Sequence, residues 1–278
     1  METGEDRPET GAERPEAEAA SAGRLQRASS FGAAAAQYAQ HRPGYAEAAI
    51  LWCLAPVSNA RPARVADVGA GTGILTGALA HLGADVVAVE PDQAMLAELR
   101  RQLPGVRAVE GSAEALPLPD RSVDAVLCGQ AMHWFDLGRA LPEIARVLTP
   151  GGVLAGLWNV DDDRVGWVAG LAAISKTGTT LSRWRAAPEP DTEWDALRAG
   201  SSRFTPVEEQ EFGNGQLRSA DSLVAALATH SRMLVMDEAE RAGTLSAIRD
   251  FLDRQPETSA GEFTLPQLTV ALRTVRRS

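Results

Sequence analysis

Between residues 64 and 158, short apolar runs alternate with longer segments in which apolar residues recur every three or four positions. Short apolar runs are typical of buried strands, and the three-to-four spacing is typical of amphipathic helices. The pattern therefore predicts five strands, at 64–69, 85–90, 106–111, 122–129 and 153–158. It predicts helices between them at 74–83, 92–103 and 136–148.

The helix expected at 92–103 carries its own boundary signals. Asp92 is a typical N-cap residue, and Pro104 and Gly105 directly follow the last apolar position, Leu103. Alternation of strands and helices predicts a parallel sheet with helices on both faces. Right-handed crossovers make such a sheet doubly wound, and its ligand binds at the carboxyl ends of the strands.

The pattern is weaker on either side of this region. Residues 1–28 are rich in Glu, Ala, Pro and Gly and have almost nothing to bury, which predicts a disordered tail. Residues 29–54 are Ala-rich and helical in character, with a break at Pro43 and Gly44. Beyond Asn159 we expect helices within 163–175 and 219–255, and strands within 203–213 and 261–275.

Composition and charge narrow the class of protein. The 278 residues carry a formal net charge of -10, and no dense run of Lys and Arg offers a basic face, so we do not expect a nucleic-acid partner. Two cysteines, Cys53 and Cys128, are too few for a disulfide framework or a tetrahedral metal site. Without a bilayer-length apolar stretch or a secretory signal pattern, we expect a cytoplasmic monomer or homodimer with no membrane partner.

The turn after the first strand, "DVGAGTG", raises the question of its ligand. A dinucleotide fingerprint reads G-x-G-x-x-G, but here Gly69, Gly71 and Gly73 make G-x-G-x-G, and Ile74 stands where the third glycine belongs. Asp67 lies inside the strand, where a carboxylate does not suit a pyrophosphate but does suit a cationic amino group. The glycine spacing and the position of Asp67 therefore favour a ligand with a cationic group over a dinucleotide.

The same stretch resembles the first motif of class I S-adenosylmethionine-dependent methyltransferases. The resemblance extends from Val65 to Trp158 and includes "GSAEALPLPDRSVDAVLC" and "ARVLTPGGVLAG". It implies a Rossmann-like α/β fold, a doubly wound and mostly parallel seven-stranded sheet with an N-terminal helical lid and a C-terminal helical insertion. The division it suggests is a tail at 1–28, a lid at 29–62, a cofactor-binding core at 63–160, and a part at 161–278 that completes the sheet and lines the substrate pocket.

The resemblance also implies roles for single residues toward S-adenosyl-L-methionine. Asp67 would hold the amino group, Glu90 would accept both ribose hydroxyls, and the turn at Ser112, Ala113 and Glu114 would surround the adenine. The remaining cofactor contacts expected in the core are Gly69, Ala70, Gly71, Thr72, Gly73, Pro91, Met95 and Gln130.

Three further segments resemble a bacterial branch related to methyltransferases of trans-aconitate and of quinone precursors: "SSFGAAAAQYAQHRPGY", "GQAMHWFD" and "FTLPQLTVALRTV". In that branch the N-terminal helices fold over the cofactor, which makes Tyr38, Arg42 and Tyr45 candidate lid residues. His133 follows the fourth strand and is either a general base, a hydrogen-bonding partner of the substrate, or a structural histidine.

Two other groups of residues are given structural roles. The run Asp161–Asp163 is interpreted as a helix cap and solvated turn, and no metal site is expected. His81 and His230 are interpreted as surface or packing residues.

These observations predict a methyltransferase that uses S-adenosylmethionine and acts on a small-molecule acceptor. The alternatives are a non-catalytic protein that binds the same cofactor and an NAD-dependent oxidoreductase. The acceptor molecule, the acceptor atom and the use of a base stay open.

Overall fold

The computed structural model describes residues 43–57, 62–176, 180–185, 192–228, 230, 233 and 235–278. The expected tail and the first part of the expected lid, including Tyr38 and Arg42, lie outside the described residues.

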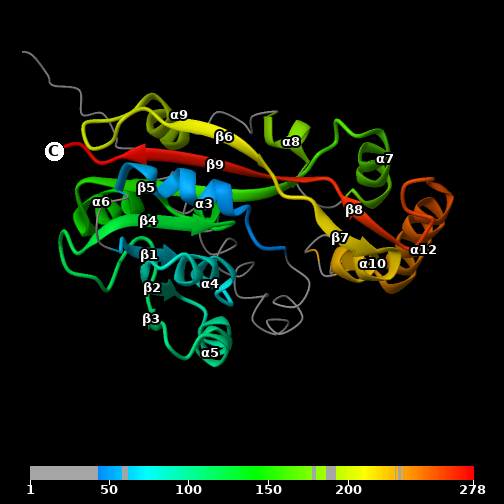
Figure 1. Ribbon diagram of the computed structural model, residues 1–278, viewed down its shortest axis with the longest axis horizontal. Helices are drawn as coiled ribbons and strands as arrows, with labels where there is room; N and C mark the ends of the chain where they lie inside the picture. Colours follow the sequence, from blue (N-terminus) through cyan, green and yellow to red (C-terminus); the bar gives the residue numbers. More distant parts are fainter. Residues whose placement is uncertain are drawn as a thin grey trace, which may run out of the picture.

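Seven strands form one sheet in the order β3-β2-β1-β4-β5-β9-β6 (Figure 1). Strands β1 to β5 run parallel to one another, while β9 is antiparallel to both β5 and β6. The doubly wound, mostly parallel sheet of seven strands is therefore confirmed. Its strands are β1 (Arg64–Val68), β2 (Asp85–Glu90), β3 (Arg107–Glu110), β4 (Val123–Gly129), β5 (Leu148–Asp161), β6 (Glu208–Gly213) and β9 (Gln267–Val275).

Strand β5 is longer than its apolar run predicts. It continues past Trp158 to Asp161 because β9, from the far end of the chain, pairs with it in register from Val153 to Asp161. Long-range pairing of this kind has no local signal, so the sequence pattern marks only the buried middle of the strand.

Helices cover both faces of the sheet. One face carries α3 (Glu47–Leu54), α4 (Ile74–His81) and α5 (Gln93–Gln102), and the other carries α6 (Leu137–Val147), α8 (Leu181–Arg185) and α9 (Thr192–Ala199). A short 3-10 turn, η2 (Ala55–Val57), ends the α3 segment. The Asp92 carboxylate accepts the backbone N–H of Ala94 and of Met95, both at 2.9 Å, which confirms the predicted N-cap of α5.

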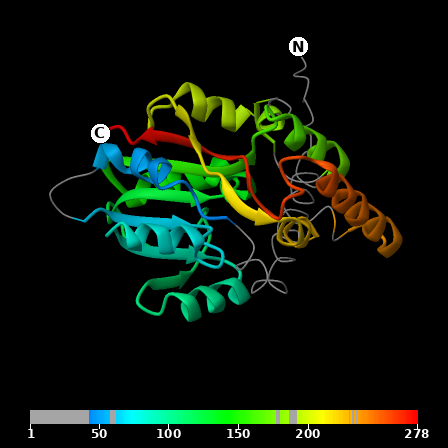
Figure 2. The ribbon, with the colours of Figure 1, turned by 45° about the vertical axis from the view of Figure 1, so that its right-hand side comes forward.

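A third group of elements stands beyond the carboxyl ends of the parallel strands, and we call it the cap (Figures 1 and 2). It consists of α7 (Gly166–Ser175), β7 (Gln216–Ser219), α10 (Ala220–Ala228), α12 (Glu238–Arg254) and β8 (Glu262–Leu265). These elements bury their own hydrophobic cluster, which includes Trp167, Leu223, Ile248, Leu252 and Phe263. The cap therefore has a packed core of its own, distinct from the two clusters that flank the sheet.

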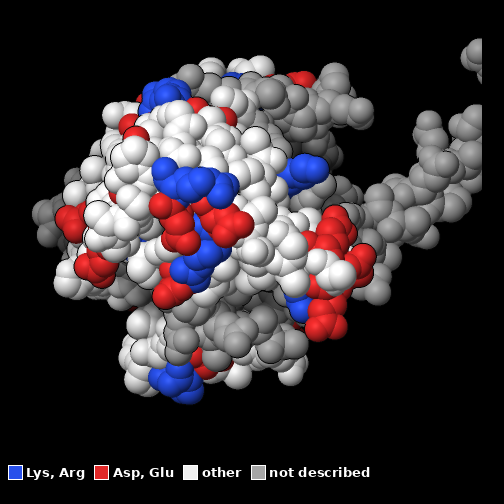
Figure 3. All heavy atoms as spheres, turned by 90° about the vertical axis from the view of Figure 1, so that its right-hand side faces the viewer, with Lys and Arg blue, Asp and Glu red and all other residues white. Residues whose placement is uncertain are grey.

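The outer end of the cap mixes acidic and basic side chains. Arg249 of α12 pairs with Asp221 of α10, and Figure 3 shows blue and red side chains next to one another on this end. Opposite charges placed so closely offset each other's field locally. None of the helices within the described residues combines the length and apolar character that crossing a bilayer requires.

Candidate functional site

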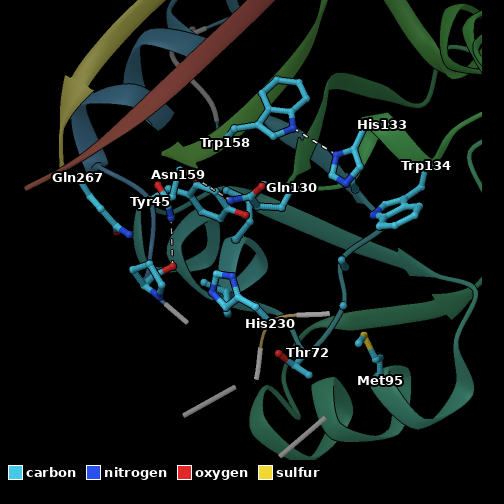
Figure 4. A pocket seen from close by; sticks show the side chains of 18 of the residues that line it. Tyr45, Thr72, Met95, Gln130, His133, Trp134, Trp158, Asn159, His230 and Gln267 are labelled. Carbon is cyan, nitrogen blue, oxygen red and sulfur yellow. Dashed lines mark hydrogen bonds between the residues drawn. The ribbon is translucent and has the colours of Figure 1, made fainter. Parts of the chain in front are cut away.

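A cavity of about 640 Å³ opens at the carboxyl ends of β1, β2, β4 and β5, with the cap on its other side (Figure 4). Its volume lies within the range of about 300–1,000 Å³ that is usual for small-molecule sites. The position is the one that a doubly wound sheet predicts for its ligand.

The glycine turn forms one wall of this cavity. Gly69, Gly71 and Gly73 have φ angles of 71°, 56° and 92°, a region that side-chain-bearing residues rarely adopt. A Cβ at Gly69 would lie 2.6 Å from the Cβ of Ala131. Gly69 and Gly71 line the cavity, whereas Gly73 is the N-cap of α4 and packs against Leu99. Gly73 therefore contributes to the conformation of the turn without lining the cavity.

Asp67 lies at the bottom of the cavity, with no exposure to solvent. Its Oδ2 accepts the hydroxyl of Thr76 at 2.5 Å, while its Oδ1 has no hydrogen-bond partner among the described residues. Burial raises the pKa of this carboxyl to about 7, helped by the nearby negative charge of Glu90 and opposed by the Thr76 hydroxyl. A buried carboxylate oxygen without a partner can accept a hydrogen bond from a cationic group of a ligand.

The raised pKa of Asp67 predicts how stability changes with pH. The folded protein holds this proton up to about pH 7, whereas the unfolded chain releases it near its ordinary pKa of 3.8. The free energy of unfolding that Asp67 contributes therefore falls as pH rises through this window, with a slope of up to about 1.4 kcal/mol per pH unit. Asp67→Asn removes this titrating group. The free energy of unfolding of the wild-type protein, measured by urea unfolding at a series of pH values, should therefore fall relative to that of the variant as pH rises through this window. A difference between the two proteins that does not change with pH would contradict the assignment.

Glu90 ends β2 on the other side of the glycine turn. Its Oε2 accepts the Gly71 N–H at 2.8 Å and its Oε1 accepts the Asp92 N–H at 2.9 Å. Each carboxylate oxygen has a second lone pair, so both can still accept a hydrogen bond from a ligand hydroxyl. Burial raises the pKa of Glu90, and the two backbone N–H groups oppose this shift.

The other expected contacts of the core also converge on the cavity. Ala113 is buried, and Glu114 accepts the Asp136 N–H through Oε1 at 3.0 Å, which holds the turn after β3 in place. The lining contains Ala70, Thr72, Pro91, Met95, Ser112, Ala113, Glu114 and Gln130. Tyr45, a candidate lid residue, also lines the cavity and lies against Gly129. A Cβ added at Gly129 would overlap the hydroxyl oxygen of Tyr45.

His133 lines the cavity from η3 (Met132–Trp134), the 3-10 turn that follows β4. The indole Nε1–H of Trp158 donates to His133 Nδ1 at 3.4 Å (Figure 4). Because an indole nitrogen only donates, Nδ1 must be the acceptor, and the neutral ring carries its proton on Nε2. A neutral ring that keeps this hydrogen bond presents an N–H group at Nε2.

Several lining residues have no counterpart in the sequence-based expectations. Trp158 and Asn159 come from β5, Arg218 from β7 and Gln267 from the start of β9. His230, interpreted from the sequence as a surface or packing residue, also lines the cavity. A position at the carboxyl end of β5 was a usable signal for Trp158 and Asn159, but nothing local marks Arg218 or Gln267.

The three aspartates at the end of β5, Asp161 to Asp163, have separate partners. Asp161 accepts Gln267 Nε2 at 2.8 Å, Asp162 pairs with Arg164 at 2.7 Å, and Asp163 accepts the Ser182 N–H at 3.0 Å. Within the part of the chain that the structure describes, no group of three or more His, Cys, Asp or Glu residues is placed to hold a metal ion.

Comparisons with known proteins agree with this geometry. A family model described as a methyltransferase domain matches residues 66–156. An uncharacterized methyltransferase of Mycobacterium tuberculosis is 39% identical over 246 residues, which cover 88% of this chain and 94% of the relative. One of Schizosaccharomyces pombe is 32% identical over 240 residues, covering 85% and 92%. A solved structure, a putative type II methyltransferase from Anaeromyxobacter dehalogenans, matches with a TM-score of 0.55 and 26% identity, over 84% of this chain and 96% of that one.

Proposed function

Since the chain belongs to the family of S-adenosylmethionine-dependent methyltransferases, we propose that it transfers the methyl group to a small-molecule acceptor bound between the sheet and the cap. Two carboxylates on either side of the glycine turn carry this proposal. Asp67 has a buried oxygen available for a cationic amino group, and Glu90 has two oxygens available for vicinal hydroxyls. The residues present therefore fit the cofactor.

Bound S-adenosylmethionine supplies a methyl carbon that its sulfonium makes electrophilic. The chain itself contributes position and exclusion of water. Gly69 and Gly71 allow the backbone to approach the ligand closely, and the turn at Ser112 to Glu114 forms the adenine side of the cavity. The cap covers the acceptor side, and the cavity volume of about 640 Å³ suits a small molecule better than a polymer.

Calorimetric titration tests the cofactor assignment directly. We expect micromolar binding of S-adenosylmethionine and of S-adenosylhomocysteine, and no binding of NAD, because Asp67 repels a pyrophosphate. Mass spectrometry of candidate acceptors incubated with enzyme and S-adenosylmethionine then identifies those that gain a methyl group. Binding of NAD in place of the sulfur ligands would overturn the proposal, and binding without transfer to any acceptor would favour the non-catalytic alternative.

A further inference from the structure

The acceptor side of the cavity is walled by aliphatic side chains of the cap. Leu171 of α7, Leu223 and Leu227 of α10 and Leu265 of β8 line it, and each of them also belongs to the cluster that holds the cap together. Ala172 and Ala226 line the cavity from the same two helices. Apolar atoms at a cavity wall gain free energy when a ligand removes them from water, in proportion to the apolar area covered.

Two tryptophans add to the apolar wall from the side of the sheet. The rings of Trp158 and Trp184 lie 4.8 Å apart between centroids, at 42°. Trp158 is almost fully buried, and a Cβ at Gly156 would overlap its ring, so its orientation is fixed by close packing. Both tryptophans line the cavity, and their flat faces suit a hydrocarbon ligand.

The polar lining residues of this half come from the ends of the sheet strands and from a few positions of the cap and the segment after α10: Asn159, Asp161 and Gln267 from the sheet, and Ser175, Arg218 and His230 from the cap and that segment. Among the lining residues of the acceptor half that the structure describes, the charged side chains apart from the histidines are Asp161 and Arg218. Asp161 and Arg218 attract each other electrostatically, and Gln267 Nε2 donates to Asp161, so this corner has little net charge. His133 adds its Nε2–H donor at the boundary with the cofactor half.

We propose that the acceptor is an amphiphile: a hydrocarbon body that lies against the cap and the two tryptophans, with one oxygen-bearing end directed to His133 and Arg218. This inference rests on the proposed function and specifies its substrate class. An acceptor that is polar along its whole length would leave charged groups against Leu171, Leu223 and Leu227, which is costly in the absence of partners. In this proposal His133 orients the acceptor by donating a hydrogen bond from Nε2.

Calorimetry tests the inference. Carboxylic acids that differ only in chain length are titrated into full-length protein that has been saturated with S-adenosylhomocysteine. In the series hexanoate, octanoate and decanoate, we expect affinity to rise by up to about fourfold with each added methylene. Suberate has the length of octanoate but ends in a second carboxylate in place of the methyl group. We expect it to bind at least about tenfold more weakly than octanoate. Octan-1-ol has the eight-carbon chain of octanoate and a neutral hydroxyl in place of the carboxylate, so it tests the contribution of the hydrocarbon chain with an uncharged oxygen.

Two pairs of neighbouring alanines supply matched variants. Ala172→Glu and Ala226→Glu place a carboxylate on the apolar wall, whereas Ala173→Glu and Ala225→Glu place it on exposed positions of the same helices, outside the lining. We expect the wall variants to lose at least about tenfold in octanoate affinity and the exposed variants to keep it. The titration of S-adenosylhomocysteine on each sample, together with its melting temperature, shows that the fold and the cofactor site are intact.

The outcomes separate the two proposals. Failure of S-adenosylhomocysteine to bind wild-type protein overturns the proposed function. Normal binding of S-adenosylhomocysteine with no dependence on chain length, or with suberate bound as tightly as octanoate, overturns the amphiphile inference alone. Equal effects of the wall variants and the exposed variants would also overturn it, because the cap wall would then have no role in binding.

Discussion

Glu90→Ala is expected to weaken the binding of S-adenosylhomocysteine by at least about tenfold, and by up to about a hundredfold, since a hydrogen bond to a charged group contributes about 1.5–3 kcal/mol. The effect has two sources. The variant loses both oxygens that we propose bind the ribose hydroxyls, and it also leaves the N–H groups of Gly71 and Asp92 without the carboxylate that they bind at 2.8 and 2.9 Å. The glycine turn is then no longer held to the end of β2.

Glu110→Ala is the matched control for this measurement. Glu110 ends β3 at the position paired with Glu90 in the parallel register, but its side chain is exposed and does not line the cavity. Calorimetry should show wild-type affinity for the Glu110 variant. If the Glu90 variant and the wild-type protein bind S-adenosylhomocysteine with equal affinity, Glu90 does not contribute to binding of the ligand.

Gly69→Ala is expected to abolish measurable cofactor binding and to lower the free energy of unfolding by about 2–5 kcal/mol. About 1–2 kcal/mol comes from placing a side chain at a φ of 71°. The remainder, about 1–3 kcal/mol, comes from overpacking, because the new Cβ would lie 2.6 Å from the Cβ of Ala131. The turn and η3 must move apart to relieve this contact, and both line the cavity.

Gly83→Ala separates strain from overlap. Gly83 has a φ of 82°, but a Cβ there meets nothing within 4 Å. This variant should lose only the strain, about 1–2 kcal/mol, and should bind S-adenosylhomocysteine normally. Urea unfolding and calorimetry on both variants give the comparison. If the two variants lose equal amounts of stability and both bind S-adenosylhomocysteine, the close approach of Gly69 to Ala131 is not required for ligand binding.

The half of the cavity that we propose for the cofactor was predictable from the sequence because the residues that form it lie close together along the chain. Each strand end carries cavity-lining residues within a few positions: Asp67 near the end of β1 and the glycine turn after it, Glu90 at the end of β2, and Ser112 to Glu114 after β3. The repeated strand–helix pattern fixes which strand ends meet. Of the expected core contacts only Gly73 lies outside the lining, because it packs against Leu99 behind the turn.

The acceptor half was not predictable in the same way. Arg218 and Gln267 reach the cavity only because β7 pairs with β8 and because β9 pairs with β5 over nine residues, and neither pairing has a local sequence signal. Trp158 was recognised only as the end of an apolar run, and its hydrogen bond to His133 joins residues that lie 25 positions apart. The role of His133 therefore depends on tertiary contacts that the order of residues does not show.

The strand order β5-β9-β6 has a consequence for synthesis on the ribosome. The interior strand β9 is made after both of its neighbours and after the whole cap. Until residues 267–275 leave the exit tunnel, β5 and β6 of the nascent polypeptide each present an open backbone edge. The sheet is consequently completed only in a late step, and a ribosome that stalls before residue 267 holds a chain that has strands β1 to β6 and the cap but an unfinished sheet.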